Sequence, residues 1–384
     1  RVNSSAKTRN SSTPEPPDFS TEKPVQKILQ VPSYRFSPDD WAARLKRAST
    51  AFSEFSSVLN SNLTFIAIRE VRSFVSTEGA RLQHGRNFFR IVISATAKGY
   101  DGYDLAVMES FEAEDPARLP KDDAILAAVR KAGRDLSNLL KAPPADPYVG
   151  PAILSGRAAG VFFHEIFGHR IEGHRQRDET EGQTFSSSLG KPVLPSFLSV
   201  TFDPSQHSLG PLDLNGWYDF DDQGIPAQRV TLVDHGILKS FLMSRTPIAA
   251  ISHSNGHGRA QPGMEPVSRQ SNLLVESSRQ VSDADLRKLL VEEVRRQNKP
   301  YGLFFEQVTG GYTTTRRQGL QAFTVIPLVV YRVFPDGRPD ELVRGADIVG
   351  TPLASFAKIL ATSNRAEVFN GYCGAESGSV PVSA

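Results

Sequence analysis

The first part of the chain alternates between helical and strand-like patterns. Hydrophobic residues recur at helical spacing from Trp41 to Leu59, directly after Ser37 and Pro38, a pair typical of a first helical turn. The period then shortens toward two, which is typical of half-exposed strands. We expect small antiparallel strands at 63–68, 71–76, 88–96 and 104–111, and a second helix at about 122–140.

The second part mixes short strands with further helices. The apolar run 161–167 predicts a buried helix that follows a short strand at 152–154. Helices are also expected from Ser282 and over 351–360. Strand patterns are found at 195–202, 217–221, 228–233, 237–243 and 323–333. Helices and mostly antiparallel strands together predict an α+β protein.

The same pattern divides the chain into three parts. Residues 1–36 are rich in Ser, Thr and Pro, and we expect a flexible tail or linker there. An N-terminal α+β domain is expected at 37–146, ending in the Pro-rich segment 142–147. A β-rich C-terminal domain is expected at 147–384. The first residue is Arg, so we interpret the chain as processed or truncated and its N-terminal domain as incomplete.

Composition narrows the classes of function only modestly. Lys and Arg number 44 against 42 Asp and Glu, a formal net charge of +2, which gives no reason to expect nucleic acid as a partner. No apolar run reaches the ~20 residues of a membrane helix, so no membrane partner is expected. The chain has 1 cysteine, which excludes an internal disulfide. We expect a cytoplasmic protein, with an exported one as the alternative.

The strongest candidate for a catalytic site is the segment that begins at His164 and ends at His169. His164 and His169 with the carboxylate of Glu165 match what a zinc hydrolase needs, namely imidazole ligands and a base. Their spacing of five places them roughly 140° apart on a regular helix. Joint binding of one ion therefore requires a wide turn, a π-bulge or a helix end between them, and Gly168 weakens the helix where such a distortion would fall. The alternative is a buried helix with hydrogen-bonded core histidines.

Catalytic zinc commonly takes three protein ligands and leaves a fourth position open. The single cysteine, Cys373, would complete that set, although a lone cysteine is more often a small buried residue. His174 is an alternative third ligand. Glu172 is a candidate partner for an imidazole N–H, or else part of a surface salt bridge.

Other candidates concern the substrate. The polar, Gly-containing segment 252–263 is typical of a flexible loop, and His257 or Arg259 in it could hold substrate or stabilise an oxyanion. Tyr312 lies in the Gly-rich segment 307–315, which could approach a substrate backbone closely. His84 and His235 are interpreted as turn residues without a role in catalysis. For the segment 252–263 the alternative is a mobile connection without a role in substrate binding.

Several separate motifs resemble one known family. They are His164-Glu165-Ile166-Phe167-Gly168-His169-Arg170-Ile171-Glu172-Gly173, Asp222-Gln223-Gly224-Ile225-Pro226, Asp234-His235-Gly236-Ile237-Leu238-Lys239, Ser254-Asn255-Gly256-His257-Gly258-Arg259 and Gly371-Tyr372-Cys373-Gly374. In this order they resemble the TldD branch of the TldD/PmbA family, zinc metallopeptidases once described as modulators of DNA gyrase. The resemblance runs from about Phe74 to the C-terminus.

The resemblance implies a zinc-dependent metallopeptidase that hydrolyses peptides or unfolded polypeptide segments. By resemblance His164, His169 and Cys373 bind one Zn²⁺ per chain, and Glu165 is the catalytic base. The PmbA branch lacks the histidine motif, so its presence favours the catalytic branch. The resemblance also implies a homodimer or a heterodimer with a paralogue, and a longer N-terminal domain than the one found here. The alternatives are a non-catalytic peptide-binding subunit and a structural zinc protein.

Overall fold

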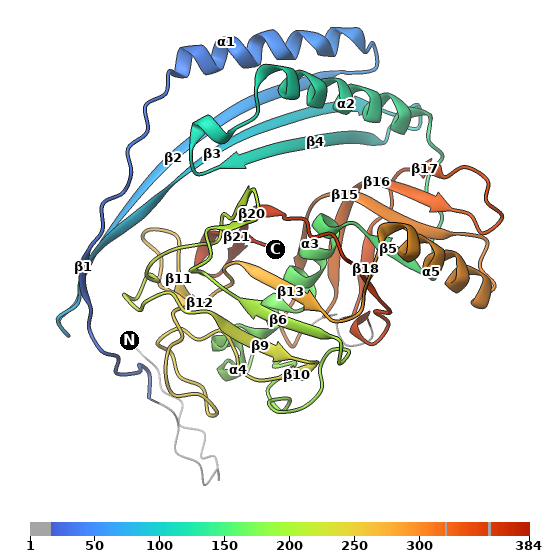
Figure 1. Ribbon diagram of the computed structural model, residues 1–384. Helices are drawn as coiled ribbons and strands as arrows, with labels where there is room; N and C mark the ends of the chain where they lie inside the picture. The colour runs from blue at the N-terminus through green and yellow to red at the C-terminus, as the bar shows by residue number, and fades with distance from the viewer. Residues whose placement is uncertain (1–16, 319–320, 352–354) are drawn as a thin grey trace.

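A long curved sheet arches over the rest of the molecule in the computed structural model, with two helices on its outer face (Figure 1). The structure describes residues 17–318, 321–351 and 355–384. Within these ranges no helix is long and apolar enough to cross a membrane. The α+β prediction is confirmed.

The curved sheet has four strands, with the longest, β3, in the middle. Its strands are β1 (Gln26–Ile28), β2 (Asn60–Val75), β3 (Arg81–Lys98) and β4 (Asp104–Ala113). β2 and β4 pair antiparallel with β3, and β1 pairs with it in parallel. The predicted strands 63–68 and 71–76 are one strand, because β2 continues through the polar residues between them.

The outer face of this sheet is covered by α1 (Pro38–Ser49) and α2 (Asp122–Lys141). Ser37 caps α1 by accepting a hydrogen bond from the Asp40 amide, as the sequence predicts. Short 3₁₀ helices at Thr50–Glu54 and Pro116–Arg118 extend the two connections. Leu59, expected on the buried helical face, is 71% exposed because the helix has already ended.

Part of the predicted tail is held against the folded chain. Residues 17–36 include β1, and the amide of Ser20 donates to the carbonyl of Arg245. The Arg245 guanidinium in turn donates to the Ser20 carbonyl and to Glu78. Residues 1–16 of the predicted tail lie outside the described residues.

The second part of the chain contains a five-stranded sheet, a four-stranded sheet and several two-stranded pieces. The first comprises β5 (Ala152–Leu154), β15 (Gly302–Thr313), β16 (Phe323–Val333), β17 (Glu341–Val343) and β18 (Ile348–Gly350). The second comprises β6 (Leu198–Phe202), β9 (Val230–Asp234), β10 (Ile237–Leu238) and β13 (Leu273–Ser277). The pieces are β7 (Ser208–Leu209), β8 (Leu212–Asp213), β11 (Gly258–Arg259), β12 (Val267–Ser268), β14 (Gln280–Val281), β19 (Thr362–Ser363), β20 (Asn370–Ala375) and β21 (Gly378–Ser383).

The helix predicted at 161–167 is α3 (Gly156–Ile166), which lies in the middle of this part of the molecule (Figure 1). Ser155 caps it by accepting from the Ala158 amide. The helix is apolar on most of its surface, as is typical of a helix packed on all sides. Ile166 and the following Phe167 are fully buried in the largest hydrophobic core, together with residues of both sheets. Other helices in the described part of the chain are α4 (His174–Arg177), α5 (Asp283–Arg296), capped by Ser282 as predicted, and the 3₁₀ turn Gly168–Ile171.

Two local predictions differ from the structure, and a third lies partly outside the described residues. His84 is a buried residue of β3, not a turn residue, because β3 begins earlier than its apolar pattern indicates. Residues 217–221 form no strand and contribute only an isolated bridge between Phe220 and Pro226. The helix predicted at 351–360 falls partly on 352–354, which lie outside the described residues.

Candidate metal centre

His164 and His169 approach each other because α3 ends between them. The α-helix stops at Ile166, and Gly168 begins a 3₁₀ turn that carries His169. A Cβ atom on Gly168 would lie 1.9 Å from Oε1 of Gln270, so the close packing here requires glycine. The centroids of the two imidazole rings lie 5.0 Å apart, and the ring planes are inclined at 85° to each other. A helix end, one of the three distortions that joint binding would require, therefore lies between the two histidines.

Cys373 reaches the same place from the other end of the chain. It lies on β20, in the C-terminal hairpin formed with β21. Its Sγ is 3.3 Å from Nε2 of His169. Ligand atoms of His164, His169 and Cys373 all lie within 4.8 Å of one another, and all three side chains are buried. We call these three residues the metal centre.

The chemistry of the metal centre fits zinc. Two imidazole nitrogens and one sulfur are ligands that Zn²⁺ takes in catalytic sites. The 3.3 Å between sulfur and nitrogen is close to the spacing of two ligands around one tetrahedral zinc, about 3.4–3.7 Å. Burial would raise the pKa of the Cys373 thiol, but the imidazoles of His169 and His164 beside it bring this pKa well below its usual value. A thiolate, the form that binds metal, is therefore favoured.

Glu165 lies beside the metal centre. Its Oε2 is 3.9 Å from Nε2 of His169, and its side chain is 6% exposed. Burial raises the pKa of this carboxyl, against the effect of the two histidines. The backbone of Gly311 in β15 passes so close that a Cβ there would lie 2.8 Å from Cγ of Glu165. The carboxylate is thus confined between α3 and one strand.

Polar side chains outside the metal centre lie next to both imidazoles. Oε2 of Glu172 lies 3.2 Å from Nδ1 of His169, which leaves Nε2 facing Cys373. This confirms Glu172 as the imidazole partner and not a surface residue, since it is fully buried. Despite this burial, His169 and Arg175 beside Glu172 hold its pKa well below the usual value. Gln270 donates to the carbonyl of His164 and lies 3.4 Å from its Nε2.

Arg170 joins the end of α3 to β15. Its guanidinium donates to the carbonyls of Glu165 and Ile166, which the helix end leaves without intrahelical partners. The same group donates to Oγ1 of Thr313 and to the carbonyl of Thr314. Glu165 and the strand beside it are therefore held by one buried cation.

Comparison with known proteins agrees with this geometry. Residues 148–382 match the family model described as the PmbA/TldA metallopeptidase C-terminal domain. The chain belongs to the PmbA/TldD metallopeptidase family.

Relatives in this family differ in how much of their length is matched. A metalloprotease of Methanocaldococcus jannaschii is 28% identical over 265 residues, which are 68% of this chain and 53% of that protein. A zinc metalloprotease TldD homologue of Saccharolobus solfataricus is 30% identical over 124 residues, covering 31% of this chain and 25% of that protein. The chain thus spans about half the length of the first relative. The crystal structure of TldE from Thermococcus kodakarensis has the same fold, with a TM-score of 0.63 at 15% identity over 97% of this chain and 78% of that one.

The remaining candidates lie elsewhere in this PmbA/TldD chain. Nε2 of His174 contacts Glu376 and is not part of the metal centre. Tyr312 is 60% exposed on β15, next to Gly311. We expected His257 and Arg259 to lie on a flexible loop. In the structure they are buried, with 0% and 2% of their surface exposed. Gly256 and Gly258 of this segment pack closely, since a Cβ there would lie 2.3 Å from the Pro226 carbonyl and 2.2 Å from Oε1 of Gln223.

Hydrogen bonds within the chain already engage His257 and Arg259. Nδ1 of His257 lies 3.0 Å from the Asn255 carbonyl, and its Nε2 lies 3.1 Å from the Ser271 hydroxyl. Burial lowers the pKa of His257 to about 3. The Arg259 guanidinium donates to the carbonyls of Gln270 and Pro381. Both residues support the segment that carries Gln270, a placement that does not favour direct contact with substrate.

Sequence reasoning missed that segment. Residues 268–272, Ser-Arg-Gln-Ser-Asn, are all fully buried although none is apolar. Gln270 contacts His164, and Arg269 contacts the C-terminal hairpin. Five consecutive polar residues ordinarily indicate an exposed loop, so the hydropathy pattern carries no signal for them.

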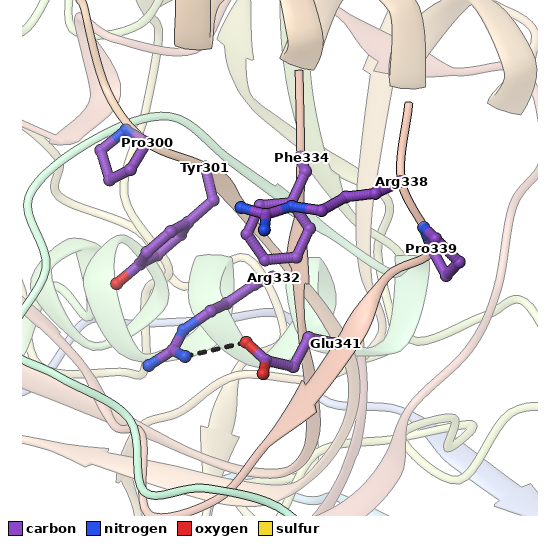
Figure 2. Close-up of a pocket in the computed structure, with 7 residues that line it drawn as sticks. All are labelled: Pro300, Tyr301, Arg332, Phe334, Arg338, Pro339 and Glu341. Carbon is purple, nitrogen blue, oxygen red and sulfur yellow. Dashed lines mark hydrogen bonds and ion pairs between the residues drawn. The ribbon is translucent and has the colours of Figure 1, made fainter. Parts of the chain in front are cut away.

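A cavity of about 410 Å³ lies at the beginning of β15 and the end of β16. Figure 2 shows the residues that line it. Two aromatic rings line it, Tyr301 and Phe334, with Arg338 over Phe334 and Arg332 paired to Glu341. None of its lining residues belongs to the metal centre or contacts it.

Proposed function

We propose that this chain is a zinc-dependent peptidase that hydrolyses peptides or unfolded polypeptide segments. The observation that carries the proposal is the convergence of His164, His169 and Cys373 on one buried point with Glu165 beside it. A structural zinc site has no need of such a carboxylate, and it usually has four protein ligands. The metal centre supplies three, which suits a catalytic site with an open position.

Each residue has a distinct task in this proposal. A bound Zn²⁺ would supply Lewis acidity that polarises the peptide carbonyl and makes water acidic enough to react near neutral pH. The Glu165 carboxylate would accept the proton of the attacking water and pass it to the leaving amine. Its raised pKa, closer to neutrality, suits both halves of that transfer. His164, His169 and Cys373 would hold the ion.

We further propose that the substrate lies along β15 as an added strand. From Gln307 to Thr313 this strand pairs with β16 on one side, and no described strand pairs with its other side. A Cβ added to Gly311 on this stretch would lie 2.8 Å from Cγ of Glu165, so a peptide paired with the free edge would run past the catalytic carboxylate. Tyr312 is the exposed side chain nearest to that path along the strand.

Backbone pairing predicts weak dependence on side chains. Methylating one peptide nitrogen that donates to β15 is expected to lower kcat/KM about 5–10-fold, since roughly one hydrogen bond is lost. Replacing single side chains is expected to change it much less. Strict dependence on one side chain, with tolerance of backbone methylation, would contradict this part of the proposal.

The main test is a Glu165→Gln variant assayed for zinc content and for cleavage of an unstructured peptide, with and without chelator. We expect full zinc content and a loss of cleavage of about 10²–10⁴-fold. The matched control is Glu265→Gln, which removes an exposed carboxylate and should cleave like the parent. Undiminished cleavage by Glu165→Gln would overturn the proposal. Cleavage that persists without zinc would do the same.

The proposal also includes the number of chains in the active protein. We propose a dimer, either of two copies or with a family paralogue, since a dimer could enclose the site. Light scattering of the purified chain alone and mixed with a paralogue distinguishes the two. A monomer in both samples would contradict it.

A further inference from the structure

Arg269 is a fully buried arginine between β12 and β13. Its Nη2 donates to the carbonyl of Cys373 at 2.6 Å. Its Nη1 donates to the Ser377 hydroxyl at 2.8 Å and to the Gly378 carbonyl at 2.9 Å. All three acceptors belong to the C-terminal hairpin, so this one side chain holds the hairpin on both sides of its turn.

The other side of the same guanidinium faces Glu172. Nε of Arg269 lies 3.6 Å from Oε1 of Glu172, and neither atom has a closer hydrogen-bond partner among the described residues. Glu172 is the carboxylate that contacts Nδ1 of His169. Arg269 therefore contacts both the orienting partner of one proposed zinc ligand and the backbone of another.

These two ligands come from distant parts of the chain, and Arg269 is one of several side chains that hold the hairpin, as Arg259 does through the Pro381 carbonyl. His169 and Cys373 are 204 residues apart in sequence, and they come from a helix end and a terminal hairpin. A buried cation without partners is very costly, so the Arg269 guanidinium stabilises only an arrangement in which the hairpin carbonyls and Glu172 surround it. That arrangement is also the one in which sulfur and imidazole meet.

We propose that Arg269 is the positioning residue that assembles the metal centre, by fixing the Cys373 hairpin against the Glu172–His169 pair. This inference rests on the zinc site of the proposed function. It adds that the affinity and sulfur ligation of the site depend on a residue that contacts no metal. Outer partners of this kind typically contribute 10–100-fold to metal affinity.

The test compares an Arg269→Met variant with the parent protein by zinc affinity, from chelator competition, and by the absorption of the cobalt-substituted protein. We expect about 10–100-fold weaker zinc binding. We also expect loss of most of the thiolate-to-cobalt charge-transfer band, which reports the Cys373 sulfur. A purely structural role would lower the melting temperature of the metal-free protein but leave that band intact.

Arg245→Met is the matched control. Arg245 is 7% exposed and donates to the Ser20 carbonyl and Glu78, so its loss removes a largely buried guanidinium whose partners lie outside the metal centre. We expect a destabilised protein with an unchanged cobalt band. Arg269→Lys keeps a charged donor and should recover part of the affinity.

Two outcomes would overturn the inference. One is zinc affinity and a cobalt band in Arg269→Met equal to those of the parent protein. The other is equal losses in Arg269→Met and Arg245→Met. If Arg269→Met does not fold, Arg269→Lys and Ser377→Ala decide, since each weakens only part of the contact set and should still reduce the cobalt band. A parent protein that binds no zinc would instead reject the proposed function itself.

Discussion

Sγ of Cys373 lies 3.3 Å from Nε2 of His169, although 204 residues separate them. The sulfur arrives on a two-stranded hairpin and the imidazole on a 3₁₀ turn that follows α3. Both atoms are buried, and burial of a thiol beside imidazoles is costly unless the groups bind one another or an ion. We therefore expect both side chains to bind the same metal ion.

Replacing the sulfur should weaken zinc binding. Cys373→Ser keeps the size of the side chain but replaces the thiolate by a hydroxyl, a much poorer ligand for Zn²⁺ at neutral pH. We expect zinc affinity, measured by competition with a chelator, to fall at least about 10-fold. A loss of that size is typical when a side chain that hydrogen-bonds to a ligand is removed, and the loss of a ligand itself should be no smaller. Affinity equal to that of the parent protein would mean that Cys373 is a buried core residue only.

Filling the space at Gly311 should reduce activity with little effect on zinc. A Cβ there would lie 2.6 Å from the Thr324 carbonyl and 2.8 Å from Cγ of Glu165. Gly311→Ala should therefore displace the carboxylate and lower kcat about 10–100-fold, as small misplacements of catalytic groups do. Zinc content, measured by elemental analysis, should stay at the parent level.

Gly374→Ala is the control for that substitution. Gly374 lies on β20, and a Cβ there would have nothing within 4 Å. Its kcat should be close to that of the parent protein. If the two variants lose the same activity, the contact between Gly311 and Glu165 is not what limits the reaction.

His257 should make the metal-free protein sensitive to acid. Burial lowers its pKa to about 3, whereas an unfolded histidine has a pKa of about 6.5. The folded state then binds fewer protons than the unfolded state between these values. The contribution of His257 is fully present above about pH 6.5 and is lost as the pH falls toward 3, by at most about 1.4 kcal/mol per pH unit.

This dependence is measured by urea unfolding across that pH range, with chelator present so that zinc release adds nothing. His257→Gln removes the titrating group, so its free energy of unfolding should fall less steeply toward acid. Its stability above about pH 6.5 should be lower, because hydrogen bonds to Asn255 and Ser271 change. Parallel curves for parent and variant would show that His257 is not the titrating group.

The sequence was most informative where chemistry and periodicity coincide. The capping residues Ser37 and Ser282 marked helix starts. The five-residue spacing of His164 and His169 meant that joint binding of one ion needed a wide turn, a π-bulge or a helix end, and the structure has a helix end. Glu172 could be named as a candidate partner for an imidazole N–H, but only the structure shows that the imidazole is that of His169.

The outer support of the metal centre could not be read from the sequence. Arg269 and Gln270 lie in a polar segment that looks exposed, and their burial depends on elements far away in the chain. His257 and Arg259 were misplaced for the same reason: glycines indicate backbone freedom but not whether a loop is packed. Only the tertiary structure shows which polar residues are enclosed.

The most direct measurement is X-ray absorption at the zinc edge of the purified, zinc-loaded protein. Ligation by His164, His169 and Cys373 predicts one sulfur at about 2.3 Å together with nitrogen or oxygen ligands at about 2.0–2.1 Å. The sulfur should vanish from the spectrum of Cys373→Ser. A spectrum without sulfur in the parent protein would contradict the metal centre, and with it the proposed peptidase.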